Sequence, residues 1–394
     1  MSDSFPEEIY EGLKIPSGKT HPVKKSVKEL HVKDVMTNDE IKAREGTYFT
    51  EKEVKTILSE DVDIYRTDPE TGEKRLLAKF RKNVFTPDEI RIGWEGFYQT
   101  AAASRNRGAA AGPIDTKSAY WKKRNPTEIT KWSAKYIQDG KVSKMRVNNN
   151  VMSSVLGFFE KTPFMGLPCR LTSYTQRFFK QYRHGIPFIE AVDDKFKQLV
   201  PEAYKKQHAA ASKKPMYRIE NTCFSSVTLN RNFRTALHCD AGDYMDGFGN
   251  LSVIERGDYS GGYTLFPQYG IGFNIRTGDF LAMDVHQWHC NTELTETPEQ
   301  AKKNKALPDI YKDDPTTGTF GTNKNFSRIS FVCYLRDKLR QCDDSQTRKY
   351  YKRIKFDPKK GNLAKNKSKF PRTRRFVTKA SSGKTEKHDK EEGE

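Results

Sequence analysis

Six short apolar runs separated by glycine-rich turns occupy the stretch from about residue 220 to residue 340. The runs are CFSSVTLNRNF, LSVIER, GYTLFP, GIGFNIR, DFLAMDV and RISFVCYLR, with turns such as DGFGN, GDYSGG and RTGD between them. Short strands with frequent turn residues between them are typical of a jelly roll or small barrel. We therefore predict an α+β fold, in which helices flank a double-stranded β-helix core of the jelly-roll or cupin-like type.

The rest of the chain divides into parts of different character. Residues 1–45 are predicted to be poorly structured, and residues 46–350 to form one folded domain. Within that domain we expect helical and strand support over 46–219 and the β-helix core over 220–340. The support includes a helix in EKEVKTILSEDVDIYR, a strand followed by a proline-started helix in KRLLAKFRKNVFTPDEI, and an amphipathic helix in PFIEAVDDKFKQLVPEAYKKQ. Residues 351–394 are basic and aperiodic, which predicts a disordered tail.

Charge and cysteine usage limit the classes of partner and compartment. The chain of 394 residues carries a formal net charge of +19, which predicts attraction to a polyanion, nucleic acid first, with a membrane surface or an acidic protein as alternatives. No apolar run approaches the roughly 20 residues of a membrane helix, and the acidic start lacks a signal peptide, so we expect an intracellular protein without a membrane partner. Six scattered cysteines without a C-x-x-C pair predict neither structural zinc nor disulfides.

A histidine and an aspartate two residues apart follow the first strand-like run. Eight histidines and 51 acidic residues would produce roughly one such pair by chance, so His238 and Asp240 alone indicate little. Downstream, His286 and His289 follow another predicted strand, and two imidazoles with one carboxylate are the donor set that holds Fe(II) on one face in non-haem oxygenases. We favour His289 as the third ligand because it lies farther from the strand, with His286 as the alternative.

An arginine and a serine on the last predicted strand complete the pattern. Arg328 and Ser330 are two positions apart, so their side chains share one face of that strand. A guanidinium is the preferred bidentate partner of a carboxylate, and the serine adds a hydroxyl. Arg328 and Ser330 are therefore predicted to bind the distal carboxylate of 2-oxoglutarate, although another dicarboxylate would suit the arginine equally.

A family resemblance extends over about residues 60–340. It rests on VTLNRNFRTALHCDAGD, GGYTLFPQYGIGFNIRTGDFLAMDVHQWHCNTEL and SRISFVCYLR in this order, with LLAKFRKNVF, VMSSVLGFFE and CRLTSYTQRFF upstream. These motifs resemble the ten-eleven-translocation and J-binding-protein group of nucleobase dioxygenases. Two departures are a long polar insertion between His289 and Arg328 and the lack of a CXXC-type zinc-binding domain.

The resemblance implies a reaction. Such an enzyme oxidises the 5-methyl group of a pyrimidine in DNA, 5-methylcytosine or thymine, to hydroxymethyl with Fe(II), 2-oxoglutarate and O2, and releases succinate and CO2. By matching motifs, His238, Asp240 and His289 become the iron ligands and Arg328 the 2-oxoglutarate anchor. Ascorbate is expected to help turnover.

Substrate residues are expected near the metal turn. Asp243 lies where the family places a polar residue against the base, and a carboxylate there accepts from the amino group of cytosine, which favours 5-methylcytosine over thymine. Asp243 could equally cap its turn. Asn230 and Asn232 are further candidates for substrate contact, although Asn-Arg-Asn is also good turn chemistry.

The favoured interpretation is thus a DNA-binding, monomeric dioxygenase, nuclear if the source is eukaryotic. Lysines and arginines in SRNRG, WKKRN and the tail are expected to contact phosphates. The alternatives are a dioxygenase of the same fold that hydroxylates protein or RNA, and a DNA-binding protein without catalysis.

Overall fold

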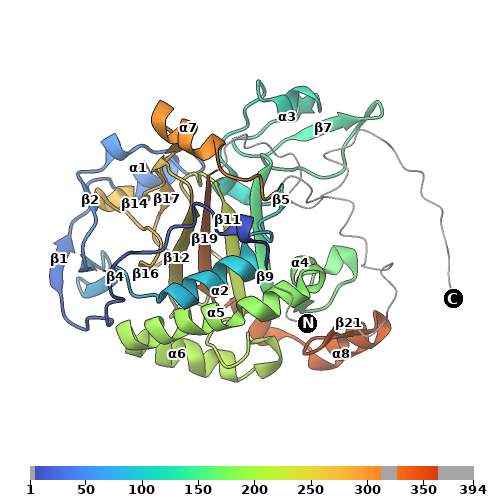
Figure 1. Cartoon of the computed structure of the whole chain (residues 1–394). Helices are drawn as coiled ribbons and strands as arrows, with labels where there is room; N and C mark the ends of the chain where they lie inside the picture. Colours follow the sequence, from blue (N-terminus) through green and yellow to red (C-terminus); the bar gives the residue numbers. More distant parts are fainter. Residues whose placement is uncertain (1–4, 312–325, 363–394) are drawn as a thin grey trace.

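The computed structural model describes residues 5–311 and 326–362, with two β-sheets at its centre (Figure 1). The larger sheet has ten strands in the order β1-β3-β4-β16-β12-β19-β11-β9-β10, with β5 paired to β9. Their bounds are β1 Lys28–Val32, β3 Val62–Thr67, β4 Lys74–Arg81, β5 Ala103–Ser104, β9 Val151–Phe159, β10 Arg170–Leu171, β11 Ser226–Arg231, β12 Gly249–Arg256, β16 Phe280–Met283 and β19 Ser327–Tyr334. The smaller sheet, β17-β14-β15-β2, is made of β17 Cys290–Asn291, β14 Thr264–Phe266, β15 Ile271–Phe273 and β2 Thr56–Leu58.

The two sheets pack against each other. One apolar cluster joins Leu251, Leu281 and Met283 of the larger sheet to Phe266 and Phe273 of the smaller one. All six runs that were predicted as strands form strands, namely β11, β12, β14, β15, β16 and β19. The fold is therefore mixed α/β with extensive sheets, and the strand predictions over 220–340 are confirmed.

Helices cover the other face of the larger sheet. Of the helices in the described residues, α2 and α5 cover this face; the full set is α1 Asn38–Ala43, α2 Pro87–Phe97, α3 Ala119–Lys122, α4 Ser173–Arg177, α5 Phe179–Leu199, α6 Pro201–Ser212, α7 Pro298–Lys305 and α8 Asp344–Arg353. Side chains of α2 and α5 form one core cluster with β11, β12, β16 and β19, and both helices cross in front of these strands in Figure 1. The crossing is close, because a Cβ on Gly96 would lie 2.6 Å from the Cα of Gly185.

Several local predictions were right and others wrong. The proline-started helix is α2, whose Thr86 side chain accepts from Glu89 N in a capping box. The expected helix over 51–66 is instead β2 and β3, because these residues pair with β15 and with β1 and β4. The amphipathic helix breaks at Val200, and Pro201 starts α6, since proline suits a first helical position better than a helix interior.

The two ends of the chain are more ordered than expected. Within the first 45 residues, β1 pairs in parallel with β3, and Ile9 and Ile41 are buried, so docking on the core organises this segment. At the other end, α8 is followed by a hairpin of β20 Phe356–Asp357 and β21 Gly361–Asn362. The remainder of the predicted tail, 363–394, lies outside the described residues.

A disulfide corrects the prediction that the chain has none. Cys169 and Cys342 are bonded, with their Cα atoms 6.0 Å apart, although 173 positions separate them in the sequence. They meet because β10 and the segment before α8 pack into one apolar cluster. Cysteine spacing along the chain carries no signal of such a contact. Among the described residues, no helix combines the length and apolar character needed to cross a lipid bilayer.

Candidate active site

Two segments of the chain bring three potential metal ligands together. His238 and Asp240 follow β11, and His289 directly precedes β17. The backbones of His238 and His289 pair through two N–H···O bonds of 3.0 Å, and Asp240 N donates to Val285 O. The ligand atoms of the three side chains lie within 4.8 Å of one another. The two Nε2 atoms are 3.7 and 3.8 Å from the Asp240 carboxylate oxygens.

Neighbouring carbonyls orient both imidazoles. Nδ1 of His238 lies 2.8 Å from Ala236 O, and Nδ1 of His289 lies 2.9 Å from Gln287 O. Each contact places the ring proton on Nδ1 and leaves the Nε2 lone pair facing Asp240. Burial, followed by the nearby His289, lowers the pKa of His238 to about 4. The ring is thus neutral at neutral pH, as a metal ligand must be.

The other candidate histidine lies elsewhere. Nε2 of His286 is 3.4 Å from Tyr244 O, and its backbone N–H donates to Asp284. Its side chain lines a different cavity, formed with Asp34, Arg66 and other residues. The cluster therefore contains His289 and not His286. The donor set, two imidazoles and one carboxylate, fits Fe(II) with open positions for other ligands.

A cavity of about 330 Å³ adjoins the three ligands. Its lining includes the predicted substrate residues Asp243 and Asn230 and the predicted co-substrate residue Ser330. It also includes residues that the sequence analysis did not single out, namely Thr228, Thr235, Thr264, Asn291, Tyr334 and Arg336. Polar groups from several strands thus converge on one cavity beside the three potential metal ligands, as expected of a small-molecule site.

Arg328 lies on the same face of β19 as Ser330. Alternate residues Ile329 and Phe331 point into the helix-side core, so Arg328 and Ser330 point toward the smaller sheet. The Arg328 side chain is 4% exposed, and its Nε and Nη2 atoms are buried without a hydrogen-bond partner in the described part of the chain. A buried unpaired guanidinium is costly.

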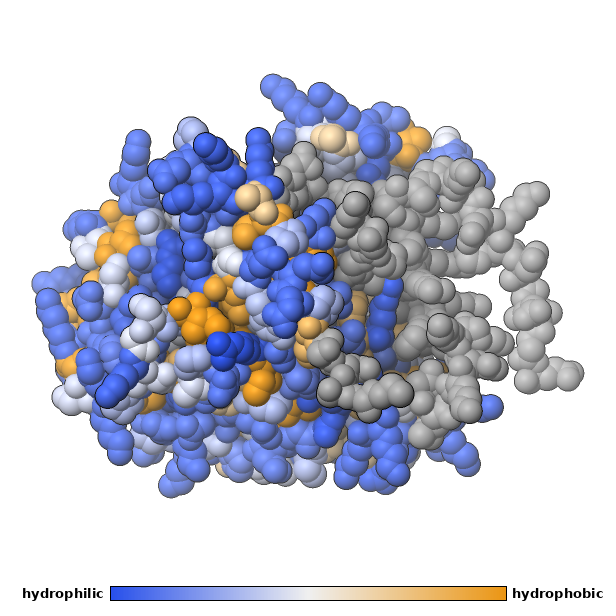
Figure 2. Space-filling model, in the orientation of Figure 1, coloured by the Kyte–Doolittle hydropathy of each residue, from blue (hydrophilic) through white to orange (hydrophobic). Residues whose placement is uncertain are grey.

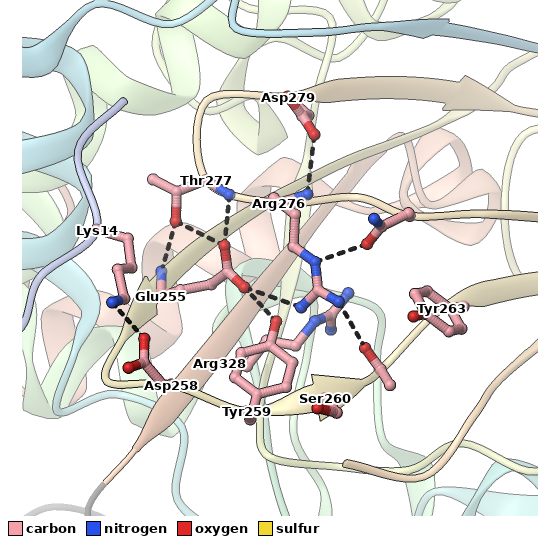
Figure 3. A network of polar contacts seen from close by, with 12 residues as sticks. Lys14, Glu255, Asp258, Tyr259, Ser260, Tyr263, Arg276, Thr277, Asp279 and Arg328 are labelled. Atoms are coloured by element: carbon pink, nitrogen blue, oxygen red, sulfur yellow. Dashed lines mark hydrogen bonds and ion pairs between the residues drawn. The ribbon is translucent and has the colours of Figure 1, made fainter. Parts of the chain in front are cut away.

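The carboxylate opposite Arg328 in the sheet already has other hydrogen-bond partners. Glu255 stands directly opposite Arg328 in the β12–β19 register. Its carboxylate instead accepts from the Tyr259 hydroxyl, from Arg276 Nη1 at 3.2 Å, and from the backbone and side chain of Thr277 at 2.7 and 3.0 Å. Figure 3 shows Arg328 beside this network with no dashed contact to it. Arg328 therefore suits a second carboxylate supplied by a ligand.

The two predicted asparagines differ in their surroundings. Asn230 lines the cavity, and its Oδ1 accepts from the Ser153 hydroxyl at 2.6 Å. Asn232 has a φ of 48°, its Oδ1 accepts from Arg328 N at 2.6 Å, and its Nδ2 donates to Phe326 O at 2.9 Å. Asn232 is absent from the cavity lining. Its amide holds the start of β19 and so fits the turn interpretation better than substrate contact.

Two arginines that the sequence analysis did not assign surround Asp243. Burial raises the pKa of Asp243 well above its usual range, and nearby Asp240 adds to this, whereas Arg336 and Arg107 act in the opposite direction. Its Oδ2 atom is buried without a partner among the described residues. Arg336 pairs with Glu160, with Nη2 to Oε1 at 2.8 Å. The only sequence signal for Arg107 was the basic SRNRG loop, whose residues 106–108 line the cavity.

A glycine leaves the space that the Arg328 side chain occupies. Gly262 has a φ of +71°, and a Cβ there would lie 2.7 Å from Leu294 Cδ2 and 3.3 Å from Arg328 Cδ and Nε. We expect Gly262→Ala to lower the free energy of unfolding in urea by about 2–4 kcal/mol, through backbone strain and crowding. Gly72→Ala is the matched control, because Gly72 has a φ of +73° and no atom within 4 Å of the added Cβ. If both variants lost the same free energy of unfolding, Leu294 and Arg328 would move aside without destabilising the protein, and crowding at Gly262 would be refuted.

Comparison with known proteins identifies the segment that carries this site. Residues 154–337 match the family described as the oxygenase domain of the 2OGFeDO superfamily, Tet_JBP. This segment is similar to the Tet_JBP oxygenase domain. It contains the three clustered ligands, Arg328 and Asp243, whereas the SRNRG loop precedes it.

Relatives of the Tet_JBP domain occur in trypanosomatids. Thymine dioxygenase JBP1 of Trypanosoma brucei brucei is 37% identical over 155 residues, 39% of this chain and 18% of that protein. Thymine dioxygenase JBP1-A of Trypanosoma cruzi is 34% identical over 189 residues, 48% and 20% of the two chains. Bifunctional helicase and thymine dioxygenase JBP2 of Leishmania infantum is 32% identical over 171 residues, 43% and 13%. The matches thus cover a fifth or less of these relatives' lengths.

A solved structure is also similar. It is that of NgTET1 in complex with 5mC DNA, which matches with a TM-score of 0.40 and 10% sequence identity, and the match covers 74% of this chain and 84% of that chain.

Proposed function

We propose that this protein is an Fe(II)- and 2-oxoglutarate-dependent dioxygenase that oxidises the 5-methyl group of a pyrimidine in DNA to hydroxymethyl. The observation that carries the proposal is the cluster of His238, Asp240 and His289 on the same side of the sheet as a buried, unpartnered Arg328. The Tet_JBP domain and the thymine dioxygenase names of its relatives support it. The proposed reaction implies a nuclear location in a eukaryotic cell.

The residues fit the two cofactors that this superfamily implies. His238, Asp240 and His289 would hold Fe(II), and Arg328 with Ser330 would hold the distal carboxylate of 2-oxoglutarate. When bound, Fe(II) and 2-oxoglutarate supply the oxidation with O2, since one oxygen atom enters the methyl group and the other enters succinate as CO2 leaves. The protein's own contribution is to orient both imidazoles through Ala236 O and Gln287 O, and to place Asp243, Asn230 and Ser330 around the cavity beside the three ligands.

The base is proposed to enter the cavity beside Asp243 and Asn230. An ionised Asp243 accepts from the amino group of 5-methylcytosine, whereas a protonated one can donate to O4 of thymine. The buried position of Asp243 favours the protonated form, and the relatives are named for thymine. We therefore propose both methylated pyrimidines as substrates, which broadens the preference for 5-methylcytosine drawn from the sequence.

The finer architecture belongs to the same proposal. We propose a double-stranded β-helix in which β11, β19, β12 and β16 form one wall and β14, β15 and β17 the other, with the site between them. The dioxygenase domain is proposed to span residues 46–350, with its β-helix core at 220–340.

Mass spectrometry of digested nucleosides tests the reaction. DNA duplexes that contain 5-methylcytosine or thymine are incubated with the protein, Fe(II), ascorbate and 2-oxoglutarate, beside a reaction without 2-oxoglutarate. We expect a nucleoside heavier by one oxygen atom, absent from the control. Succinate formation with no modified nucleoside would refute DNA as the substrate and favour the alternatives of RNA or protein.

A further inference from the structure

A small basic module projects next to the candidate active site. Residues 113–147, the basic flap, contain α3 and a three-stranded sheet of β6 Pro126–Thr127, β7 Lys135–Gln138 and β8 Lys141–Val142. Trp121, Ala134 and Val147 form its own buried cluster, separate from the main core. The flap stands at the top right of Figure 1, where α3 and β7 are labelled, and it precedes the segment that matches the Tet_JBP family.

The flap concentrates unpaired positive charge. It contains nine lysines and arginines against three acidic residues, a formal surplus of six. One of the acids, Glu128, already pairs with Lys135 at 2.9 Å and Arg146 at 3.3 Å. Five exposed lysines have no ion-pair partner within the described ranges, namely Lys117, Lys122, Lys123, Lys141 and Lys144. Such a surface attracts a polyanion.

The flap also exposes apolar side chains among these charges. Of the seven large hydrophobic residues that are exposed in the described part of the chain, four lie on the flap: Ile129, Ile137, Val142 and Met145. Ile137 and Val142 face each other across the β7–β8 hairpin and are 43% and 50% exposed. Figure 2 shows a few hydrophobic residues between hydrophilic ones on this projection. A lysine-rich surface that also exposes apolar side chains suits a nucleic-acid groove, where phosphates flank apolar sugar and base edges.

Hydrogen bonds connect the flap to the mouth of the cavity. Asn148, just after the flap, donates from N to Arg105 O at 2.9 Å and accepts from Gly108 N at 2.8 Å. Asn106 and Gly108 are exposed and line the cavity, so the mouth opens beside them. The segment that contains Asn106 and Gly108 also contacts the chain just before His238, because Ala236 N donates to Ala110 O at 2.9 Å.

We propose that the basic flap binds duplex DNA next to the nucleotide that enters the cavity, with its lysines on phosphates and Ile137 and Val142 in a groove. The choice of DNA rests on the proposed function. A methyl group inside a duplex is out of reach of a buried site, so the nucleotide must leave the stack while the flanking duplex stays held near the mouth. The flap is the charged surface that the structure ties to this mouth.

Equilibrium binding to a fluorescent DNA duplex tests the lysines, without Fe(II) or 2-oxoglutarate, so that the result does not depend on oxidation. We expect K122Q/K123Q/K141Q to weaken binding at least about 10-fold near 0.15 M salt and to reduce the slope of log K against log salt by about two to three. The matched control is K197Q/K205Q/K213Q, which removes equal charge from exposed positions on and next to α5 and α6, and it should change affinity no more than about 2-fold. Unchanged melting temperatures verify that each variant is folded.

Replacement of Ile137 and Val142 should change the salt dependence of DNA binding in a different way. I137S/V142S should weaken binding at every salt concentration and leave the slope unchanged, because no counterion is released by an apolar contact. Equal weakening by both lysine triples, no weakening by the flap triple, or tighter binding of an RNA duplex than of the DNA duplex would each overturn the proposal. If DNA affinity depended on the flap but no oxidised base formed, DNA binding by the flap would be supported and the proposed oxidation would be refuted. Failure of the flap proposal and failure of the proposed function are therefore distinguishable.

Discussion

Replacement of Asp240 by alanine is expected to abolish 2-oxoglutarate turnover, with a loss of more than about 100-fold. Loss of a residue that only orients a metal ligand already costs 10–100-fold, and Asp240 is the carboxylate that both Nε2 atoms face at 3.7 and 3.8 Å. Succinate formation measures the turnover, and calorimetric titration with Fe(II) in the absence of O2 measures metal affinity separately. The protein should stay folded, since among the described residues the Asp240 side chain forms no ion pair with a lysine or an arginine.

Histidine variants complete this experiment. His289→Ala should lose metal affinity as Asp240→Ala does, whereas His286→Ala is the control and should keep both affinity and turnover. The reason is that His286 contacts Tyr244 O and lines a different cavity. Loss of Fe(II) affinity in the His286 variant with retention in the His289 variant would refute the proposed ligand set.

The strands were within reach of sequence reasoning because they depend on local periodicity, whereas the ligand cluster was inferred from the order of its motifs and from the family resemblance. His238 and Asp240 were expected to share a face of a strand, but they follow β11 and are placed by backbone hydrogen bonds to His289 and Val285. The choice of His289 over His286 depended on the length of chain after β16, which is also local. In the structure His238, Asp240 and His289 form one cluster.

Tertiary contacts could not be predicted in the same way. Arg107 and Arg336 approach Asp243 from opposite ends of the folded domain; the basic SRNRG loop suggested a phosphate contact for Arg107, and nothing marks Arg336 among the 70 lysines and arginines of the chain. Asn232 illustrates an ambiguity, since its side chain suited both substrate contact and a turn, and only the pairing of β11 with β19 favours the turn. The Cys169–Cys342 bond likewise follows from the packing of distant segments.

The second large effect concerns Arg328. We expect Arg328→Ala to raise the KM for 2-oxoglutarate by about 100-fold or more, because two charge-assisted hydrogen bonds to a carboxylate contribute about 1.5–3 kcal/mol each. Its Nε and Nη2 atoms are the donors that are buried without a partner among the described residues, while Glu255 is bound by Arg276. Ser330→Ala removes a single neutral hydroxyl and should raise the KM by only about 3- to 10-fold.

A 2-oxo acid without the distal carboxylate separates anchoring from a general defect. 2-Oxobutyrate cannot pair with a guanidinium at that end, so its weak turnover should have the same KM in the wild-type protein and in Arg328→Ala, while the KM for 2-oxoglutarate rises. Fe(II) affinity and DNA affinity should also be unchanged, because Arg328 belongs neither to the ligand cluster nor to the flap. If the KM for 2-oxoglutarate stayed at the wild-type value, Arg328 would not be the anchor, and the cationic partner of the co-substrate would have to be another arginine, with Arg276 next to be tested.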